Sequence, residues 1–231
     1  MHSSDPLFPW FFGAAILIAA VIILIGFLQQ KKRTAALTAL APTLGFNFQG
    51  DDSSDASCGP LQTALFSRGS SRKFRNVMTG TFAGDRVGIF DYSYTTGSGK
   101  SSTTWTQTVV AFSLEIWLPF FELHPESFLD RVADVVIHKD VDFTSHPEFS
   151  RRYLLRGNEQ EKICELFSPA LLTFLEGLDS ATKWHIEGDG YVLIFYCSDT
   201  LVAPEEILPL LEKTSSIAKN FIACSGLQKQ A

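Results

Sequence analysis

Residues 95–101 come closest to a chemical motif in this chain. Their ending, Gly99-Lys100-Ser101, matches the end of a phosphate-binding loop, in which backbone N–H groups and a lysine hold nucleotide phosphates. The complete motif needs a glycine where Tyr94 stands, and a helix where residues 102–108 are instead rich in β-formers. We therefore expect a hairpin loop. Contact of this loop with a ligand or partner stays open as an alternative, through the polar residues Thr95, Thr96, Ser98 and Lys100.

Other patterns in the chain fall short of catalysis or metal binding. Ser70 and Lys73 have the Ser-x-x-Lys spacing of serine acyltransferases, but the companion Ser-Asp-Asn and Lys-Thr-Gly elements are missing. Four histidines beyond the N-terminal region show neither an i, i+4 pair nor His-Glu-x-x-His, so only the fold could assemble a metal site from them: His124, His138, His146 and His185. The four cysteines form no Cys-x-x-Cys pair, which fits thiols in a reducing compartment. The sequence assigns no catalytic residue, metal ligand or cofactor.

Basic side chains gather at two places in the sequence. One group follows an apolar run, and the other precedes a predicted strand; their members are Lys31, Lys32 and Arg33, and Arg68, Arg72, Lys73 and Arg75. We expect a solvated basic edge, with contact to anionic lipid head groups as the alternative. Residues 34–231 nevertheless carry 16 basic against 24 acidic side chains. This balance argues against nucleic acid as a partner, because such binding needs basic surface to neutralise phosphates.

Residues 7–28 are 22 positions without a single charged side chain. As a helix they would span about 33 Å, close to the ~30 Å hydrocarbon core of a bilayer. A cleaved signal peptide is disfavoured, since residues 1–6 hold no Lys or Arg and the basic cluster follows the apolar run. Because Lys- and Arg-rich flanks stay in the cytoplasm, we expect a single-pass protein of the cell membrane with its C-terminal domain inside the cell.

The domain boundaries follow from these composition shifts. Residues 1–30 form an N-terminal segment with a transmembrane helix at about 7–28, and residues 31–45 form a basic flank and an amphipathic stem helix. Residues 46–231 form one cytosolic domain, whose size suits a single core.

The fold class is predicted as α+β, with a mainly antiparallel sheet and helices on one face. Alternating residues at 77–82, 87–94 and 105–114 predict a three-stranded meander. Pro119 is expected to break that run, and a short strand at residues 120–123 should lead to a helix from Pro125. A helix from Asn158 is expected to bend or restart at Pro169 and end at Gly177. Residues 184–196 predict a hairpin turning at 188–190, and a last helix begins near residue 204.

Several stretches resemble an uncharacterised bacterial family of single-pass membrane-anchored proteins, a domain of unknown function. They are residues 90–100, 107–109, 118–121 with Pro125-Glu126, and 149–157, within a similarity that covers roughly residues 30–215. The family pattern has Arg where His124 stands, which weakens any role for that position. The resemblance implies an anchored cytosolic domain and supplies no catalytic residue.

These observations favour a membrane-tethered cytosolic module for interaction, sensing or scaffolding, with the lipid bilayer and a protein of unknown identity as partners. The alternative is an enzyme or small-ligand binder whose site is assembled near residues 95–100.

Overall fold

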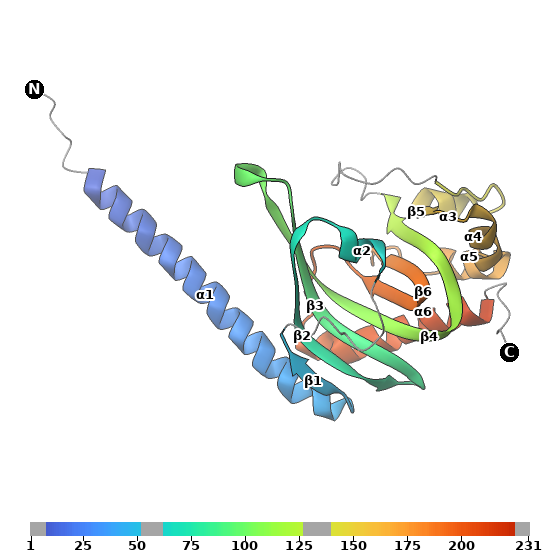
Figure 1. Cartoon of the computed structure of the whole chain (residues 1–231), viewed down its shortest axis with the longest axis horizontal. Coiled ribbons are helices and arrows are strands. Elements are labelled where there is room, and N and C mark those ends of the chain that lie inside the picture. Colours follow the sequence, from blue (N-terminus) through green and yellow to red (C-terminus); the bar gives the residue numbers. More distant parts are fainter. Residues whose placement is uncertain (1–7, 52–61, 127–139, 225–231) are drawn as a thin grey trace, which may run out of the picture.

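The structure is a computed structural model that describes residues 8–51, 62–126 and 140–224, with side chains of the first helix from Ile16 onward. Helix α1 (Phe8–Thr43) is continuous, and its N-terminal half extends away from the remainder of the molecule (Figure 1). Large apolar side chains along this extension are solvent-exposed, from Ile16 at 67% to Leu28 at 53%. In the part of the chain that the structure describes, no helix combines the length and the apolar character needed to cross a membrane.

A six-stranded antiparallel sheet forms the centre of the fold, which confirms the α+β class. Its strands are β1 (Asn47–Gly50), β2 (Ser70–Phe82), β3 (Asp85–Thr96), β4 (Thr103–Pro125), β5 (Tyr153–Gly157) and β6 (His185–Tyr196). The order is β1-β2-β3-β4-β5, and β6 pairs with β4 as well. The long β4 bends strongly across the molecule (Figure 1), so it can hold β3, β5 and β6 along its length.

The predicted meander of β2, β3 and β4 is present, and each strand is longer than expected. The expected break at Pro119 is wrong, because β4 continues through it to Pro125. Register shifts between Ser113 and Phe121 in the β4–β6 ladder mark this stretch. Such irregularities let a strand bend and accommodate a proline without losing its partner strand. The helix expected from Pro125 falls largely on residues 127–139, which lie outside the described residues.

The predicted hairpin at residues 184–196 is also wrong, since β6 is one continuous strand. Both of its ends pair with β4, at Val109↔Tyr196 and at Leu123↔Ile186. Gly188 lies so close to the Phe121 ring that an added Cβ would stand 2.3 Å from it. Gly188, which resembled part of a turn, therefore serves close packing of β6 on β4, whereas Gly190 has φ +59° and open space around it.

The helices that follow the meander are α3 (Pro147–Arg152), α4 (Gln160–Leu166), α5 (Pro169–Glu176) and α6 (Ile207–Cys224). The restart at Pro169, the end at Gly177 and the final helix agree with the sequence. Ser168 caps α5 by accepting a hydrogen bond from the Leu171 amide at 3.3 Å, and Pro169 occupies the first turn of the helix.

Each face of the sheet has its own hydrophobic core. One core joins the second half of α1 with α3–α6 and includes Leu37, Ile89 and Phe221. The other lies under the short helix α2 (Ala64–Ser67) and includes Phe66 and Phe90. Ile89 and Phe90 belong to different cores because neighbouring residues of a strand point to opposite faces. Helix α2 thus departs from the expectation of helices on one face.

Candidate functional site

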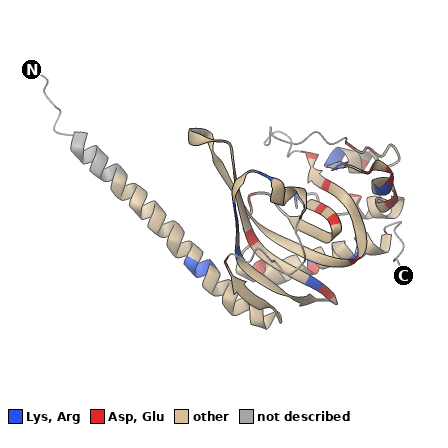
Figure 2. Ribbon diagram, in the orientation of Figure 1, with Lys and Arg blue, Asp and Glu red and all other residues tan. Residues whose placement is uncertain are grey.

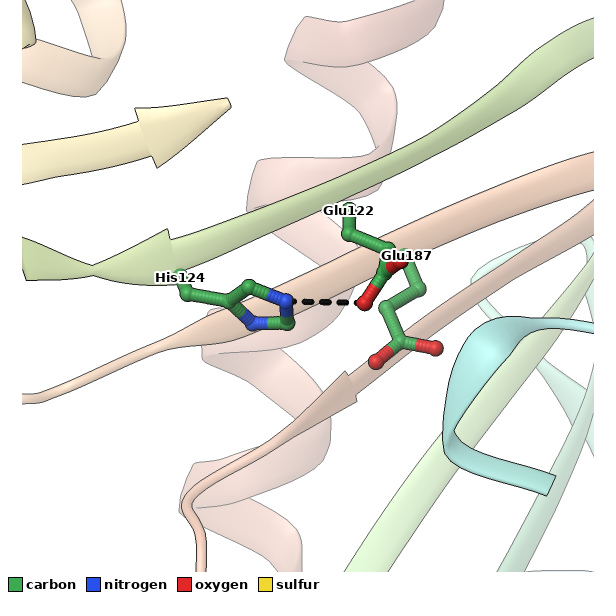
Figure 3. A group of neighbouring side chains, drawn as sticks. All are labelled: Glu122, His124 and Glu187. Carbon is green, nitrogen blue, oxygen red and sulfur yellow. Dashed lines mark hydrogen bonds and ion pairs between the residues drawn. The ribbon is translucent and has the colours of Figure 1, made fainter. Parts of the chain in front are cut away.

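A group of ionisable side chains lies buried beneath α2, and we call it the Arg68 cluster. Arg68 follows α2, while the other members come in pairs from the neighbouring strands β4 and β6 and are completed by a tyrosine at the end of β6: Glu122, His124, His185, Glu187 and Tyr196. The strand pairs have the same two-residue spacing, so both members of a pair point to the same face of the sheet. Three of these side chains are drawn in Figure 3, where they point toward one another.

Strand register explains why an arginine is needed at this place. Glu122 and Glu187 are directly opposite each other in the β4–β6 ladder, and like charges opposite each other destabilise a sheet. Arg68 Nη2 donates to Glu122 Oε2 at 2.8 Å and to Glu187 Oε1 at 3.2 Å. The guanidinium therefore bridges two carboxylates that would otherwise repel.

Glu187 is completely buried and is held from several directions. One carboxylate oxygen accepts a hydrogen bond from the Tyr196 hydroxyl at 2.6 Å, and the other accepts one from the Leu65 backbone amide at 2.8 Å. Because a buried carboxylate needs such donors, Glu187 connects the backbone of α2 to β6.

The two histidines extend the network away from Arg68. His124 Nε2 lies 3.0 Å from Glu122 Oε2 and 3.3 Å from Arg68 Nη2, and its Nδ1 lies 2.9 Å from His185 Nδ1. The His185 ring stacks on the Tyr196 ring, with centroids 4.8 Å apart. A short contact between two ring nitrogens requires that one donates and the other accepts, so this pair can share a proton.

The environment changes the proton affinities of the cluster. Burial by itself raises the pKa of Glu122, but the hydrogen bond with His124 and the charges of His124 and Arg68 outweigh it and lower the pKa to about 2. Burial, aided by the charges of His124 and Arg68, lowers the pKa of His185 well below its ordinary value. Burial also raises the pKa of Tyr196 well above its ordinary value. The cluster therefore holds Glu122 ionised, His185 neutral and Tyr196 protonated at neutral pH.

The ligand atoms for a metal ion are present in the cluster. One ligand atom each from Glu122, His124 and Glu187 lies within 4.8 Å of the others, a set that suits zinc or a similar cation. Arg68 Nη2 stands 2.8–3.3 Å from all three residues, where such an ion would sit. In this arrangement the guanidinium supplies the positive charge, and a metal would have to displace it.

The Arg68 cluster is not predicted from the sequence. Arg68 is expected there on a basic surface edge, and no functional role follows for the cluster's other members, Glu122, His124, His185 and Glu187. A signal was available, because Glu122-Leu123-His124 and His185-Ile186-Glu187 are mirror images, and antiparallel pairing brings like residues together. The signal can be interpreted only when the register of β4 and β6 is known, because the register shows which residues lie opposite each other.

A second buried ion pair, which we call the Arg33 lock, joins α1 to the other face of the sheet. Arg33 Nε and Nη2 donate to the two carboxylate oxygens of Asp91 on β3, each at 2.8 Å. Its Nη1 donates to the Val202 carbonyl at 2.6 Å. Asp91 also accepts from the Asn76 amide at 2.8 Å and the Thr108 hydroxyl at 3.1 Å. The lock therefore holds α1 on the sheet: Asp91 balances the charge of Arg33, and neutral groups complete the hydrogen bonds of both.

The predicted basic edge needs a correction, since two of its seven members are buried in ion pairs. Arg33 and Arg68 side chains are only 12% and 16% exposed. Arg72 is exposed and donates to the carbonyls of Ser67, Arg68 and Gly69, which fastens the end of α2. The remaining members, Lys31, Lys32, Lys73 and Arg75, are exposed or partly exposed.

The residues predicted for a ligand loop lie in the hairpin between β3 and β4. Thr96 pairs with Thr103, and the turn contains the short 3-10 helix η1 (Gly99–Ser101). Gly97 has φ +77°, and an added Cβ would stand 2.4 Å from the Ser101 carbonyl oxygen, so this turn needs glycine there. Thr95 and Thr104 hydroxyls are 3.1 Å apart, and Trp105 Nε1 donates to Thr96 Oγ1 at 2.9 Å.

Comparison with known proteins shows a similar fold in one solved structure and assigns the chain to no family. No family model matches the chain, and no curated protein matches it. The fold is similar to that of mycobacterial trehalose monomycolate transport factor A. The similarity has a TM-score of 0.55 and covers 81% of this chain and 94% of that chain, at 10% sequence identity. At this identity the likeness describes the fold alone.

Proposed function

We propose that this chain is a membrane-tethered interaction or scaffolding module, with residues 7–28 embedded in the bilayer and the α+β domain on its cytoplasmic side. The single observation that carries the proposal is the continuity of α1. One helix bears both an uncharged, exposed apolar half and the Arg33 lock that joins it to the sheet.

The exposed half of α1 supports insertion into lipid. Apolar side chains such as Ile16, Ile23 and Phe27 are 65–71% exposed, and each square ångström of such surface costs about 25 cal/mol in water. A contiguous apolar surface of this kind marks an interaction with a membrane or another protein. The absence of charge over residues 7–28, followed directly by Lys31 and Lys32, favours the membrane.

The attachment of α1 supports a scaffolding role over a loosely tethered one. The lock holds the helix where it leaves the membrane segment, and Leu37 and Ala41 are buried in the core one and two turns further on. A helix joined to its domain in this way presents the domain at a defined angle to the bilayer. The Arg68 cluster, in turn, is closed by its own ion pairs and stabilises the α2 side of the sheet.

A topology experiment tests the proposal. A reporter fused after Ala231 should report cytoplasm in cells, and the full chain should stay in membranes washed with alkaline carbonate. The double substitution Lys31→Glu and Lys32→Glu should disturb the orientation, because it removes the positive flank. Arg33 is left unchanged, since its substitution would also break the lock.

The matched control is Lys162→Glu with Lys219→Glu, which changes the same charge at exposed positions far along the chain. This control should leave the orientation as it is. Release of the natural chain by carbonate, or a reporter signal from the opposite side of the membrane, would contradict the proposal.

A further inference from the structure

The direction of α1 relative to the sheet places the β3–β4 hairpin on the membrane side. Thr34 donates to Asn76 of β2 at 2.7 Å, whereas Phe46, beyond the end of α1, packs on Gly80 further along β2. Moving toward the N-terminus of α1 is therefore moving toward Ser70 in β2 and toward Thr96 in β3. Figure 1 shows the hairpin tip and the N-terminal half of α1 extending to the same side of the domain.

The hairpin is long enough to reach the level where the apolar run of α1 ends. Gly97 is six residues beyond Asp91, which is about 20 Å along a strand. Leu28 is five residues before Arg33, which is about 8 Å along a helix. Because Arg33 and Asp91 are in direct contact, even a strongly tilted hairpin brings its tip level with Leu28.

The charges on this side of the domain differ from those of the whole. The segments concerned are 28–32 of α1, 70–75 of β2 and 92–105 around the hairpin, and they hold six basic residues and no acidic one: Lys31, Lys32, Arg72, Lys73, Arg75 and Lys100. Asp199 stands at the base of this region, where it accepts a hydrogen bond from the Thr106 amide. The basic residues of α1 form the blue segment of that helix in Figure 2.

We propose that the tip of the β3–β4 hairpin, together with Lys31, Lys32 and Lys73, contacts the anionic head groups of the membrane that holds α1. The proposal rests on the proposed function, because it needs α1 in the bilayer. The hairpin suits this contact, since paired Thr95 and Thr104 and the hydrogen bond from Trp105 to Thr96 keep it ordered close to its tip. Basic residues near an anionic leaflet are attracted to it, and the tip adds hydroxyl and amide groups that can bind lipid phosphates.

Fluorescence quenching in nanodiscs tests this contact with the full chain. A fluorescent amino acid is introduced at Ser98 in the hairpin tip or, as the matched control, at Thr81 near the opposite end of the same sheet region. Both positions are exposed. The discs contain anionic phosphatidylglycerol and a lipid with a nitroxide on its head group. We expect quenching at Ser98 to be at least threefold stronger than at Thr81.

Equal quenching at the two positions, or none at Ser98 in chains bound to discs, would overturn the proposal. Failure of the chain to incorporate into discs would instead contradict the membrane anchor itself, so the two failures are distinguishable.

A second experiment tests whether the contact depends on the charge of the lipid head groups. Discs of neutral phosphatidylcholine, and the double substitution Lys73→Gln and Lys100→Gln in anionic discs, should each reduce quenching at Ser98 at least twofold. Quenching that both changes leave intact would show that anionic head groups are not what the hairpin binds.

Discussion

Arg33 and Arg68 each bind carboxylates on the sheet, but they do so on opposite faces and with different charge balance. In the Arg33 lock one guanidinium meets one carboxylate, and neutral partners complete the hydrogen bonds of both. In the Arg68 cluster one guanidinium meets two carboxylates, Glu122 and Glu187, with a buried histidine pair beside them. The lock is neutral by itself, whereas the cluster depends on Arg68 and on the protonation of its neighbours.

This difference separates two roles for buried ion pairs in the same domain. The lock joins helix α1 to the sheet through one guanidinium and one carboxylate. The cluster closes the α2 side of the sheet with one guanidinium between two carboxylates, and burial keeps His185 neutral beside them. Buried charge is costly unless it is balanced, so the cluster is the place where a single substitution or a change in pH has the larger consequence.

Replacement of Arg68 should have the largest effect on stability. Arg68→Met leaves Glu122 and Glu187 buried and opposite each other, and removing one partner of a buried ion pair costs about 3–5 kcal/mol. We expect the upper end of that range, measured as the free energy of unfolding in urea. Adding Glu122→Gln to Arg68→Met should restore part of the loss, because only one carboxylate then remains unbalanced.

The control for this measurement is Arg151→Met. Its ion pair with Glu148 is on the surface, with the Arg151 side chain 69% exposed, so the change should lie within about 0.5 kcal/mol. A loss below about 1 kcal/mol for Arg68→Met would show that the two glutamates do not depend on the guanidinium.

Local patterns in the sequence predict the elements of this fold better than their pairing. The meander and the restart at Pro169 follow from alternation and from the backbone restriction of proline, which act over a few residues. The breaks expected at Pro119 and at residues 188–190 are wrong for one common reason. Both occur in the β4–β6 ladder, where pairing with a strand about 70 residues away keeps the chain extended through residues that favour turns.

Dependence on long-range contacts also explains why the Arg33 lock and the Arg68 cluster could not be predicted from the sequence. Arg33 and Arg68 look like other surface arginines in sequence, and only long-range contacts bring them to Asp91 and Glu187. The composition of a basic segment cannot show which of its arginines form buried ion pairs. The expectation of a membrane segment at residues 7–28 is different in kind, because it depends only on an uninterrupted run of residues without charge.

Replacement of Arg33 should have the second largest effect. Arg33→Met leaves Asp91 with the hydrogen bonds of Asn76 and Thr108 but without a countercharge, and we expect a loss of about 3 kcal/mol in the free energy of unfolding. Lys32→Met is the matched control, since Lys32 is exposed on the same helix turn and should change stability by less than about 0.5 kcal/mol.

A double-mutant cycle with Asp91→Asn distinguishes the lock from packing of the arginine stem. The losses of Arg33→Met and Asp91→Asn should be strongly non-additive, because each removes the same ion pair. Additive losses would mean that α1 is held by its apolar contacts alone. The Arg33 lock would then not be a stabilising ion pair that can be compared with the Arg68 cluster.

The smallest expected effect is a loss of stability in mild acid that originates in the cluster. His185 has a pKa lowered below its ordinary value of 6.5, so the folded chain binds fewer protons than the unfolded chain below that pH. Stability from this group is therefore present above pH 6.5 and is lost as the pH falls, by at most about 1.4 kcal/mol per pH unit for one proton. Glu122, with its pKa lowered to about 2, adds a second loss of stability in the same direction, which begins as the pH falls toward the ordinary carboxyl pKa of 4.5.

Urea unfolding at pH 7.5 and 5.5 should show the first loss in the natural chain and a much smaller one in His185→Gln, whatever the absolute stability of that variant. His146→Gln, which removes a histidine outside the cluster, should retain the pH dependence of the natural chain. An unchanged pH dependence in His185→Gln would place the titrating group elsewhere and remove the main difference between the cluster and the lock.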